Sequence, residues 1–229
     1  MKVAVLLSGG LDSTTALHWA HRHHEVVCAL SFDYGSNHAA RELECARWQA
    51  QALGIPYHEI NLRTISAHLR SALLSGADAI PTADYEEDNL KQTVVPFRNG
   101  IFLAIAAGIA ESADAEGIVI AAHSGDHSLY PDCTEGFMQA MAQAIALGTY
   151  AKLCILRPFI DFTKEQITAL GAELGVDFSH TYSCYCGRPA HCGQCATCRE
   201  RRQSFRNAAI PDPTIYEDSA PEACLTGLL

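Results

Sequence analysis

The sequence predicts an α/β fold in which a parallel sheet carries helices on both faces. Short apolar runs alternate with longer amphipathic or alanine-rich segments, which is the order of elements found in parallel sheets. Polar, glycine-bearing segments directly follow several of the apolar runs. The 229 residues are 48% hydrophobic, which is enough for one compact core. We therefore expect a Rossmann-like domain whose ligands bind at the carboxyl ends of its strands.

The individual elements follow from the apolar runs and the helix stop signals. Strands are expected at residues 3–7, 26–32, 57–62, 118–122 and 154–156. Helices are expected from about Asp12 onward, over residues 39–53, 98–112, 134–147 and 163–174, and from about Cys195. Gly54 and Gly175 lie where two of these helices should end. The two glycines inside residues 98–112 are expected to permit close packing against the sheet.

Composition excludes several classes of protein. The formal net charge of −10 argues against a broad surface for nucleic acid. No apolar run approaches 18 residues, so we expect no membrane-spanning helix. The first residues lack the long apolar region of a signal peptide, so we expect a cytoplasmic protein.

The first strand runs directly into a loop suited to binding phosphate. Two glycines let the backbone approach an anion closely, and the first turn of the following helix presents N–H groups and a positive dipole end. Ser13 is also a candidate cap of that helix. No lysine follows in the Walker A position, and the third glycine of a dinucleotide fingerprint is absent. The candidate nucleotide ligands here are Ser8, Gly9, Gly10, Leu11, Asp12 and Ser13.

Five of the ten cysteines crowd into residues 184–198. Cys184, Cys192, Cys195 and Cys198 have the spacing of a site with four thiolate ligands, and structural Zn²⁺ is the expected ion. An iron–sulfur cluster is the alternative, because thiolates bind it equally well. Cys186 is interpreted as a spare thiol, since it is too close to Cys184 to join the same tetrahedron.

Four further stretches complete a recognisable set with the glycine loop: residues 32–35 (FDYG), 95–99 (VPFRN), 125–133 (GDHSLYPDC) and 183–201. In this order they resemble the 7-cyano-7-deazaguanine synthases, a family within the PP-loop ATP pyrophosphatases. The resemblance covers roughly residues 1–206. It implies a fold of the adenine nucleotide alpha hydrolase type with a C-terminal zinc-binding segment.

The resemblance also implies a reaction. ATP and Mg²⁺ would activate the carboxylate of 7-carboxy-7-deazaguanine as an acyl-adenylate with release of pyrophosphate. Ammonia would displace AMP to give an amide, and a second ATP would activate the amide oxygen before the nitrile forms. Relatives of this family are often homodimers, so a homodimer is expected.

Residue roles are carried over from the matching positions. The resemblance implies that ATP is held by residues 8–13 together with Phe32, Tyr34 and Arg98. Asp12, Ser13 and Arg98 would be catalytic, with Asp12 near Mg²⁺. The deazaguanine would be bound by Asp126, His127, Tyr130 and Asp132.

Three parts of the chain are expected: a PP-loop synthase domain over 1–178, a zinc-binding segment with its helix over 179–210, and a loosely held tail over 211–229. The polar region 75–93, with acidic residues 84–88, is either a solvated loop or a flap over the nucleotide. Thr134 stands where many family members have arginine, which is a departure from the pattern of the family.

The alternatives use the same loop differently. A related PP-loop enzyme would attach an adenylated deazaguanine to a protein or nucleic acid. A tRNA thiolase would use a cysteine such as Cys133, but the net charge opposes tRNA binding. A non-catalytic zinc module would leave the phosphate loop unexplained.

Overall fold

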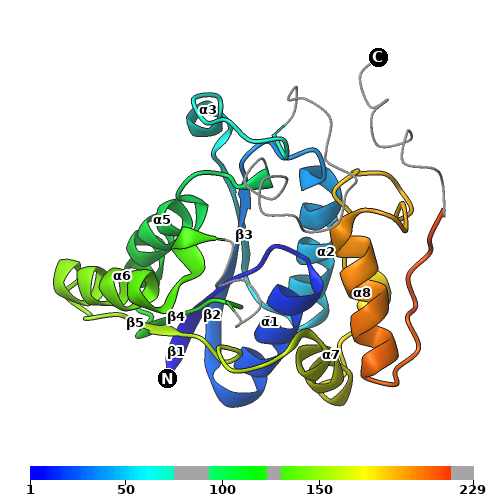
Figure 1. Ribbon diagram of the computed structural model, residues 1–229. Coiled ribbons are helices and arrows are strands. Elements are labelled where there is room, and N and C mark those ends of the chain that lie inside the picture. Colours follow the sequence, from blue (N-terminus) through cyan, green and yellow to red (C-terminus); the bar gives the residue numbers. More distant parts are fainter. Residues whose placement is uncertain (75–92, 123–129, 218–229) are drawn as a thin grey trace.

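The computed structural model describes residues 1–74, 93–122 and 130–217 (Figure 1). Strands and helices alternate through these residues, as the sequence predicts. The strands are β1 (Lys2–Leu6), β2 (Glu25–Asp33), β3 (Tyr57–Asn61), β4 (Gly117–Val119) and β5 (Cys154–Leu156). The α-helices are α1 (Leu11–His23), α2 (Ala39–Ala52), α3 (Arg63–Ser66), α5 (Arg98–Ser112), α6 (Glu135–Gly148), α7 (Lys164–Glu173) and α8 (Ala196–Asn207). Two short 3₁₀ helices are η2 (Pro131–Cys133) and η3 (Phe178–His180).

The five strands form one parallel sheet in the order β3-β2-β1-β4-β5. The chain builds the sheet outward from β1 through β2 to β3, then returns to place β4 on the other side of β1. This reversal makes the gap beyond the carboxyl ends of β1 and β4 a topological switch point, where open α/β sheets bind ligands. The glycine loop that follows β1 therefore lies at the place where a ligand is expected.

Alternating side chains of β1 supply the cores on the two faces of the sheet. Ala4 and Leu6 belong to the core that packs under α5 and α6. Val3 and Val5, together with Leu7 just after the strand, belong to the core under α1, α2, α7 and α8. Figure 1 shows this division, with α5 and α6 on one side of the strands and the other long helices on the opposite side. The predicted fold class, with helices on both faces, is confirmed.

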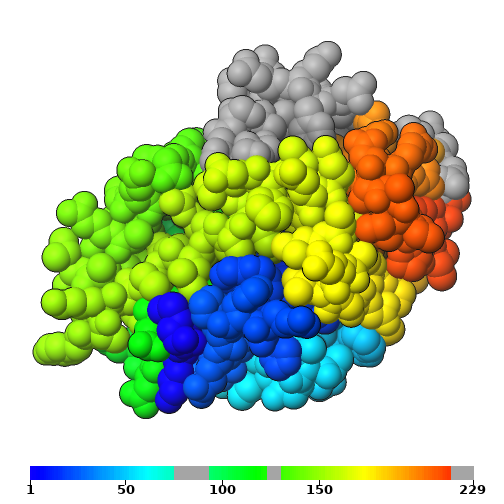
Figure 2. All heavy atoms as spheres, turned by 90° about the horizontal axis from the view of Figure 1, so that it is seen from below, coloured from blue at the N-terminus to red at the C-terminus, as the bar shows by residue number. Residues whose placement is uncertain are grey.

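The helix α7 links the sheet domain to the C-terminal helix. It packs against both α1 and α8, and Figure 2 shows α8 in orange next to the yellow region that contains α7. Phe178 and Phe205 meet edge to face with ring centroids 5.0 Å apart, which fixes α8 on this core. No α-helix of the described residues is both long and apolar enough to span a bilayer.

The predicted elements match the structure closely, but the expected role of the two glycines in α5 is wrong. A Cβ on Gly108 would meet nothing within 4 Å, and one on Gly100 would lie 2.4 Å from the ring of Phe97 rather than against the sheet. The core-facing residues of α5 are instead Leu103, Ala106 and Ala110, which are small or flexible enough to pack closely.

Gly108→Ala is therefore expected to stabilise the protein by about 0.5–1 kcal/mol, because alanine loses less backbone entropy in a helix and has room here. Gly171→Ala is the matched contrast in α7. Its Cβ would lie 2.6 Å from Phe178 Cζ and 2.7 Å from Thr15 Oγ1, so overpacking should cost about 1–3 kcal/mol. Urea unfolding of both variants measures the two free energies; equal shifts would contradict this account.

Part of the expected tail is tied to the cysteine segment. His191 N–H donates to Ile215 O, and Glu217 N–H donates to His191 O. Arg201 Nε donates to Thr214 Oγ1 at 2.7 Å. The remaining residues of the tail, 218–229, lie outside the described residues, as does the expected flap apart from Thr93.

Candidate active site and cysteine cluster

The loop between β1 and α1 is held in shape by its own hydroxyl groups. Ser13 Oγ accepts a hydrogen bond from Ser8 N–H at 3.1 Å and lies 2.8 Å from Ser8 Oγ. The cap of α1 is Gly10, and no side chain caps this helix. Ser13 is the third residue of α1, so its expected role as a helix cap is wrong. Its hydroxyl instead closes the loop around the start of the helix.

Gly9 allows this loop to lie directly on α2. Its φ is +87°, a conformation that favours glycine. A Cβ at this position would lie 2.1 Å from Glu42 O and 2.8 Å from Ala46 N. The backbone of α2 therefore acts as the support on which the phosphate loop rests.

A cavity of about 480 Å³ opens above the carboxyl ends of β1, β2 and β4. Most of the residues predicted for the site line it: Ser8, Gly10, Leu11, Asp12, Ser13, Phe32, Tyr34, Arg98, Tyr130 and Asp132. Gly9 is not among the lining residues, because it faces α2. Asp126 and His127 lie outside the described residues.

Lys164 is a cation in this pocket that sequence reasoning missed. Its Nζ lies 2.5 Å from Asp12 Oδ2 and 3.6 Å from Glu200 Oε2. It occupies the first position of α7, whose start is fixed by a capping box between Thr163 and Gln166. Asp12 and Lys164 are 152 residues apart, and only the packing of α7 on α1 brings them together.

Arg98 enters the pocket from the first turn of α5. Phe97, just before it, has a left-handed φ of 55° and an exposed ring, and this bend starts the helix at the pocket wall. Arg98 Nη1 donates to Tyr34 Oη at 3.4 Å. Burial opposes the charge of Arg98, but Tyr34 and the carboxyl groups of Asp132 and Glu42 hold its pKa above the ordinary value. Arg98 is thus positioned to bind an anion.

Two predicted residues of the pocket have structural roles as well. Phe32 stacks on Phe102 with ring centroids 4.3 Å apart and is part of the core. Asp132 Oδ2 accepts the backbone N–H of Asn99 at 2.8 Å and so satisfies an amide in the first turn of α5. Cys133 is buried, and its Sγ accepts from Asn99 Nδ2 at 3.1 Å.

Thr134, the departure from the family pattern, has a local role. Its side-chain oxygen accepts from Phe137 N–H at 3.3 Å and donates to Pro131 O at 2.9 Å. It therefore caps α6 and joins that helix to η2, which carries Asp132.

His38 and Glu42 are further pocket residues that sequence reasoning missed. They lie one turn apart at the start of α2, with His38 Nε2 3.6 Å from Glu42 Oε2. Burial lowers the pKa of His38 to about 4, and Arg98 contributes in the same direction. Burial raises the pKa of Glu42 to about 8, while Arg98 acts in the opposite direction. In the sequence, His38 and Glu42 have the spacing of polar residues on one helix face, and that spacing does not indicate that their side chains are buried.

The four predicted cysteine ligands converge at the start of α8. The Sγ atoms of Cys184, Cys192, Cys195 and Cys198 all lie within 4.8 Å of one another, and all four residues are buried. Two of the Sγ–Sγ distances are 4.0 Å. Thiolates bound at about 2.3 Å to one tetrahedral ion would be about 3.8 Å apart, so the donor set fits a single metal ion. Cys186 is not part of this group.

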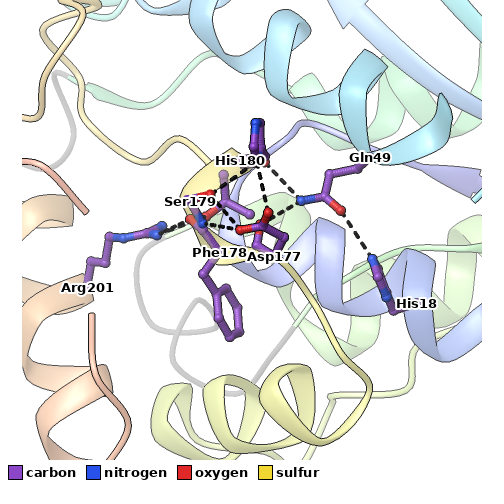
Figure 3. A network of polar contacts seen from close by, with 8 residues as sticks. His18, Gln49, Asp177, Phe178, Ser179, His180 and Arg201 are labelled. Atoms are coloured by element: carbon purple, nitrogen blue, oxygen red, sulfur yellow. Dashed lines mark hydrogen bonds and ion pairs between the residues drawn. The ribbon is translucent and has the colours of Figure 1, made fainter. Parts of the chain in front are cut away.

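A polar network around residues 177–180 joins α1 and α2 to α8 (Figure 3). Gln49 Nε2, from α2, donates to Asp177 O and His180 O, and its Oε1 lies 3.2 Å from His18 Nε2 of α1. On the other side, the buried Arg201 of α8 donates to Phe178 O at 3.0 Å. Residues 177–181 are thus held from both sides.

The residue that follows segment 177–181 contacts the glycine loop. Tyr182 N–H donates to Gly9 O at 2.9 Å. Arg201 Nη1 also donates to Ser183 Oγ at 3.1 Å, next to the first cysteine ligand. The pocket is lined on this side by Tyr182, Ser183, Tyr185, Thr197, Glu200 and Arg201. The cysteine segment therefore forms one wall of the pocket.

Residues 2–209 match the family model described as "Queuosine biosynthesis protein QueC". The chain belongs to the QueC family. It is 47% identical over 213 residues to a 7-cyano-7-deazaguanine synthase of Porphyromonas gingivalis, covering 93% of this chain and 96% of that protein. A protein of the same name from Brucella ovis is 45% identical over 221 residues, covering 96% of this chain and 95% of that one.

The fold also resembles that of a solved 4-thiouridine synthetase, in a complex with RNA and bound ATP. The TM-score is 0.50 at 19% sequence identity, over 91% of this chain. This chain matches half of that protein's length. The likeness concerns the fold alone, because the sequence identity is low.

Proposed function

We propose that this QueC family member converts 7-carboxy-7-deazaguanine, ATP and ammonia into 7-cyano-7-deazaguanine. The observation that carries the proposal is that a chain of this family also has a pocket whose residues are arranged to bind an anion. The loop of residues 8–13 opens into the same pocket as Arg98 and Lys164. Two successive adenylations each release pyrophosphate, and a site that holds ATP phosphates serves both.

The residues divide between the two substrates. The loop amides and the hydroxyls of Ser8 and Ser13 would hold the phosphates, and Arg98 and Lys164 would neutralise charge as pyrophosphate leaves. Tyr130 and Asp132 lie in the same pocket and would contact the deazaguanine. Asp132 has one carboxylate oxygen committed to Asn99, so it would offer the other to an N–H group of the base.

Two metals belong to the proposal. The buried four-thiolate set suits Zn²⁺, because one ion requires sulfurs this close together, whereas an iron–sulfur cluster spreads its thiolates over several irons. Asp12 supplies the hard oxygen ligand that Mg²⁺ prefers. When bound, Mg²⁺ neutralises phosphate charge. ATP phosphates would compete for the Lys164 ammonium and free Asp12 for this role.

We further propose that ammonia is the nitrogen donor, that the protein works as a homodimer and that it resides in the cytoplasm. Donor identity is tested by the reaction below, and the oligomeric state by light scattering of the purified protein. The family resemblance motivates both.

The test is mass spectrometry of a reaction containing purified protein, ATP, Mg²⁺, ammonium and 7-carboxy-7-deazaguanine. The expected products are the nitrile, AMP and pyrophosphate, with isotope from ¹⁵N-ammonium in the nitrile group. Formation of an adenylate that ammonium never converts would redirect the proposal toward a macromolecular acceptor. Metal-loaded protein that cleaves no ATP would refute it.

Asp12→Ala is expected to lower pyrophosphate release by at least about 100-fold, because both the Mg²⁺ ligand and the partner of Lys164 are lost. Metal bound by the cysteines should be unchanged, since Asp12 is not among the thiolate ligands. Asp114→Ala, two residues beyond the end of α5 and outside the pocket lining, is the control and should retain full activity. Normal turnover by Asp12→Ala would remove this residue from the reaction.

A further inference from the structure

Carboxyl groups in the pocket differ in what they already bind. Those of the described residues that line it are Asp12, Glu42, Asp132 and Glu200. Two of them lie within 3.6 Å of the Lys164 ammonium. A third, Asp132, accepts a backbone N–H of α5. Glu42 is the one among these four with neither a bonded lysine nor a helix amide on its carboxyl group.

Glu42 is fixed in place by its helix. Its carbonyl oxygen lies against Gly9, so the residue sits beside the loop proposed to hold the ATP phosphates. Its side chain is 20% exposed, and Glu42 lines the pocket. His38 Nε2 lies 3.6 Å from Glu42 Oε2, which is beyond hydrogen-bond distance.

Burial, opposed by the charge of Arg98, leaves Glu42 able to exchange a proton near neutral pH. The groups that face it are His38 and Cys45 on its own helix, Tyr34 after β2 and Arg98 on α5. With a pKa of about 4, His38 is uncharged at neutral pH and does not pair with the carboxylate. Burial outweighs Arg98 and gives Glu42 a pKa of about 8. Such opposed shifts are typical of acid–base sites.

The proposed function requires a proton acceptor in this pocket. When ammonia attacks the acyl-adenylate, a C–N bond forms, the bond from carbon to the AMP oxygen breaks, and AMP leaves with that electron pair. The nitrogen must then lose one proton to become the amide. When the adenylated amide becomes a nitrile, the second C–O bond breaks in the same way, and the nitrogen loses both of its remaining protons.

We propose that Glu42 is the catalytic residue that accepts these protons from the nitrogen. The inference rests on the proposed function and deepens it. The Glu42 carboxylate takes one proton at a time and passes it to solvent through its exposed edge before the next is released. Arg98 and His38 line the same pocket as Glu42.

The test separates adenylation from the nitrogen steps. Pyrophosphate release measures the first adenylation, and hydroxylamine traps the acyl-adenylate as a hydroxamate. Glu42→Gln has the shape of protonated glutamate, so it should fold and should retain pyrophosphate release and trapping within about threefold. Conversion of ammonia to amide and of amide to nitrile should fall by about 10²–10⁴-fold, the range expected for loss of a general base.

The pH profile gives a second readout. At a constant concentration of unprotonated ammonia, wild-type kcat/KM should rise with pH through about 8, because a protonated Glu42 cannot accept a proton. Glu42→Asp should show the same rise of kcat/KM with pH but at lower values, and Glu42→Gln should show no such rise. Glu44→Gln is the matched control, since Glu44 is exposed, pairs with Arg41 and lies outside the pocket.

Each outcome is decisive. Unchanged amide and nitrile formation by Glu42→Gln would overturn the inference and leave the proposed function intact. An equal loss of adenylation and of the nitrogen steps would also overturn it, since Glu42 would then bind substrate rather than a proton. Absence of adenylation in the wild-type protein would instead contradict the proposed function.

Discussion

Gly9→Ala is expected to reduce pyrophosphate release by at least about 100-fold, the cost of displacing a catalytic group by about 1 Å. The new Cβ would lie 2.1 Å from Glu42 O and 2.8 Å from Ala46 N, and both atoms belong to the backbone of a packed helix. Neither can turn aside as a side chain would, so the loop itself must move. Its φ of +87° adds about 1–2 kcal/mol of strain for alanine.

Gly54→Ala separates the two effects. Gly54 has a similar φ of +68°, but a Cβ there would meet nothing within 4 Å. The Gly54→Ala variant should lose about 1–2 kcal/mol of stability and retain its activity. Steady-state pyrophosphate assays and urea unfolding of both variants make the comparison. If Gly9→Ala lost no more activity and stability than Gly54→Ala, close packing of the loop on α2 would have no part in catalysis.

Cys192→Ser is expected to remove the bound metal and most of the ATP-cleaving activity together. A serine hydroxyl is a poor replacement for one of four buried thiolates around one ion. Structural zinc sites in isolated fingers supply about 10–16 kcal/mol of apparent binding energy, so the segment around this site should loosen when the ion is lost. Activity should fall because Tyr182, which donates to Gly9, lies two residues before the first ligand.

Metal content by mass spectrometry and thermal unfolding measure both consequences. Cys154→Ser is the control, because Cys154 is half-buried in β5 and lies outside the cluster. It should retain its metal and its activity. Full metal occupancy in Cys192→Ser would exclude the four-cysteine site, and metal loss with normal ATP cleavage would exclude its influence on the loop.

The sequence predicted the elements of the sheet domain well, because the information there is local. Apolar runs and stop signals set β5 and α5 at the residues expected, and the other strands and long helices within a few residues. The cysteine spacing likewise predicted which four side chains converge. In each case a short stretch of chain carries its own periodicity or ligand spacing.

The residues that sequence reasoning missed depend on packing between distant segments. Lys164 contacts Asp12, which is 152 residues away in the sequence. The pKa of Glu42 is raised by its burial beside the loop. The capping role predicted for Ser13 was wrong because Gly10 is the N-cap of α1 and Ser13 lies inside the helix. Spacing along a helix says which residues share a face, but it does not say what that face will meet.

The wall formed by the cysteine segment has a consequence for synthesis on the ribosome. Every strand of the sheet is complete once Leu156 has emerged, but the hydrogen bond from Tyr182 to Gly9 and the side chains of α8 come from the last quarter of the chain. A nascent chain can therefore fold its sheet while its nucleotide pocket still lacks one side. We therefore expect competence to cleave ATP to arise only after the residues of α8 have been translated.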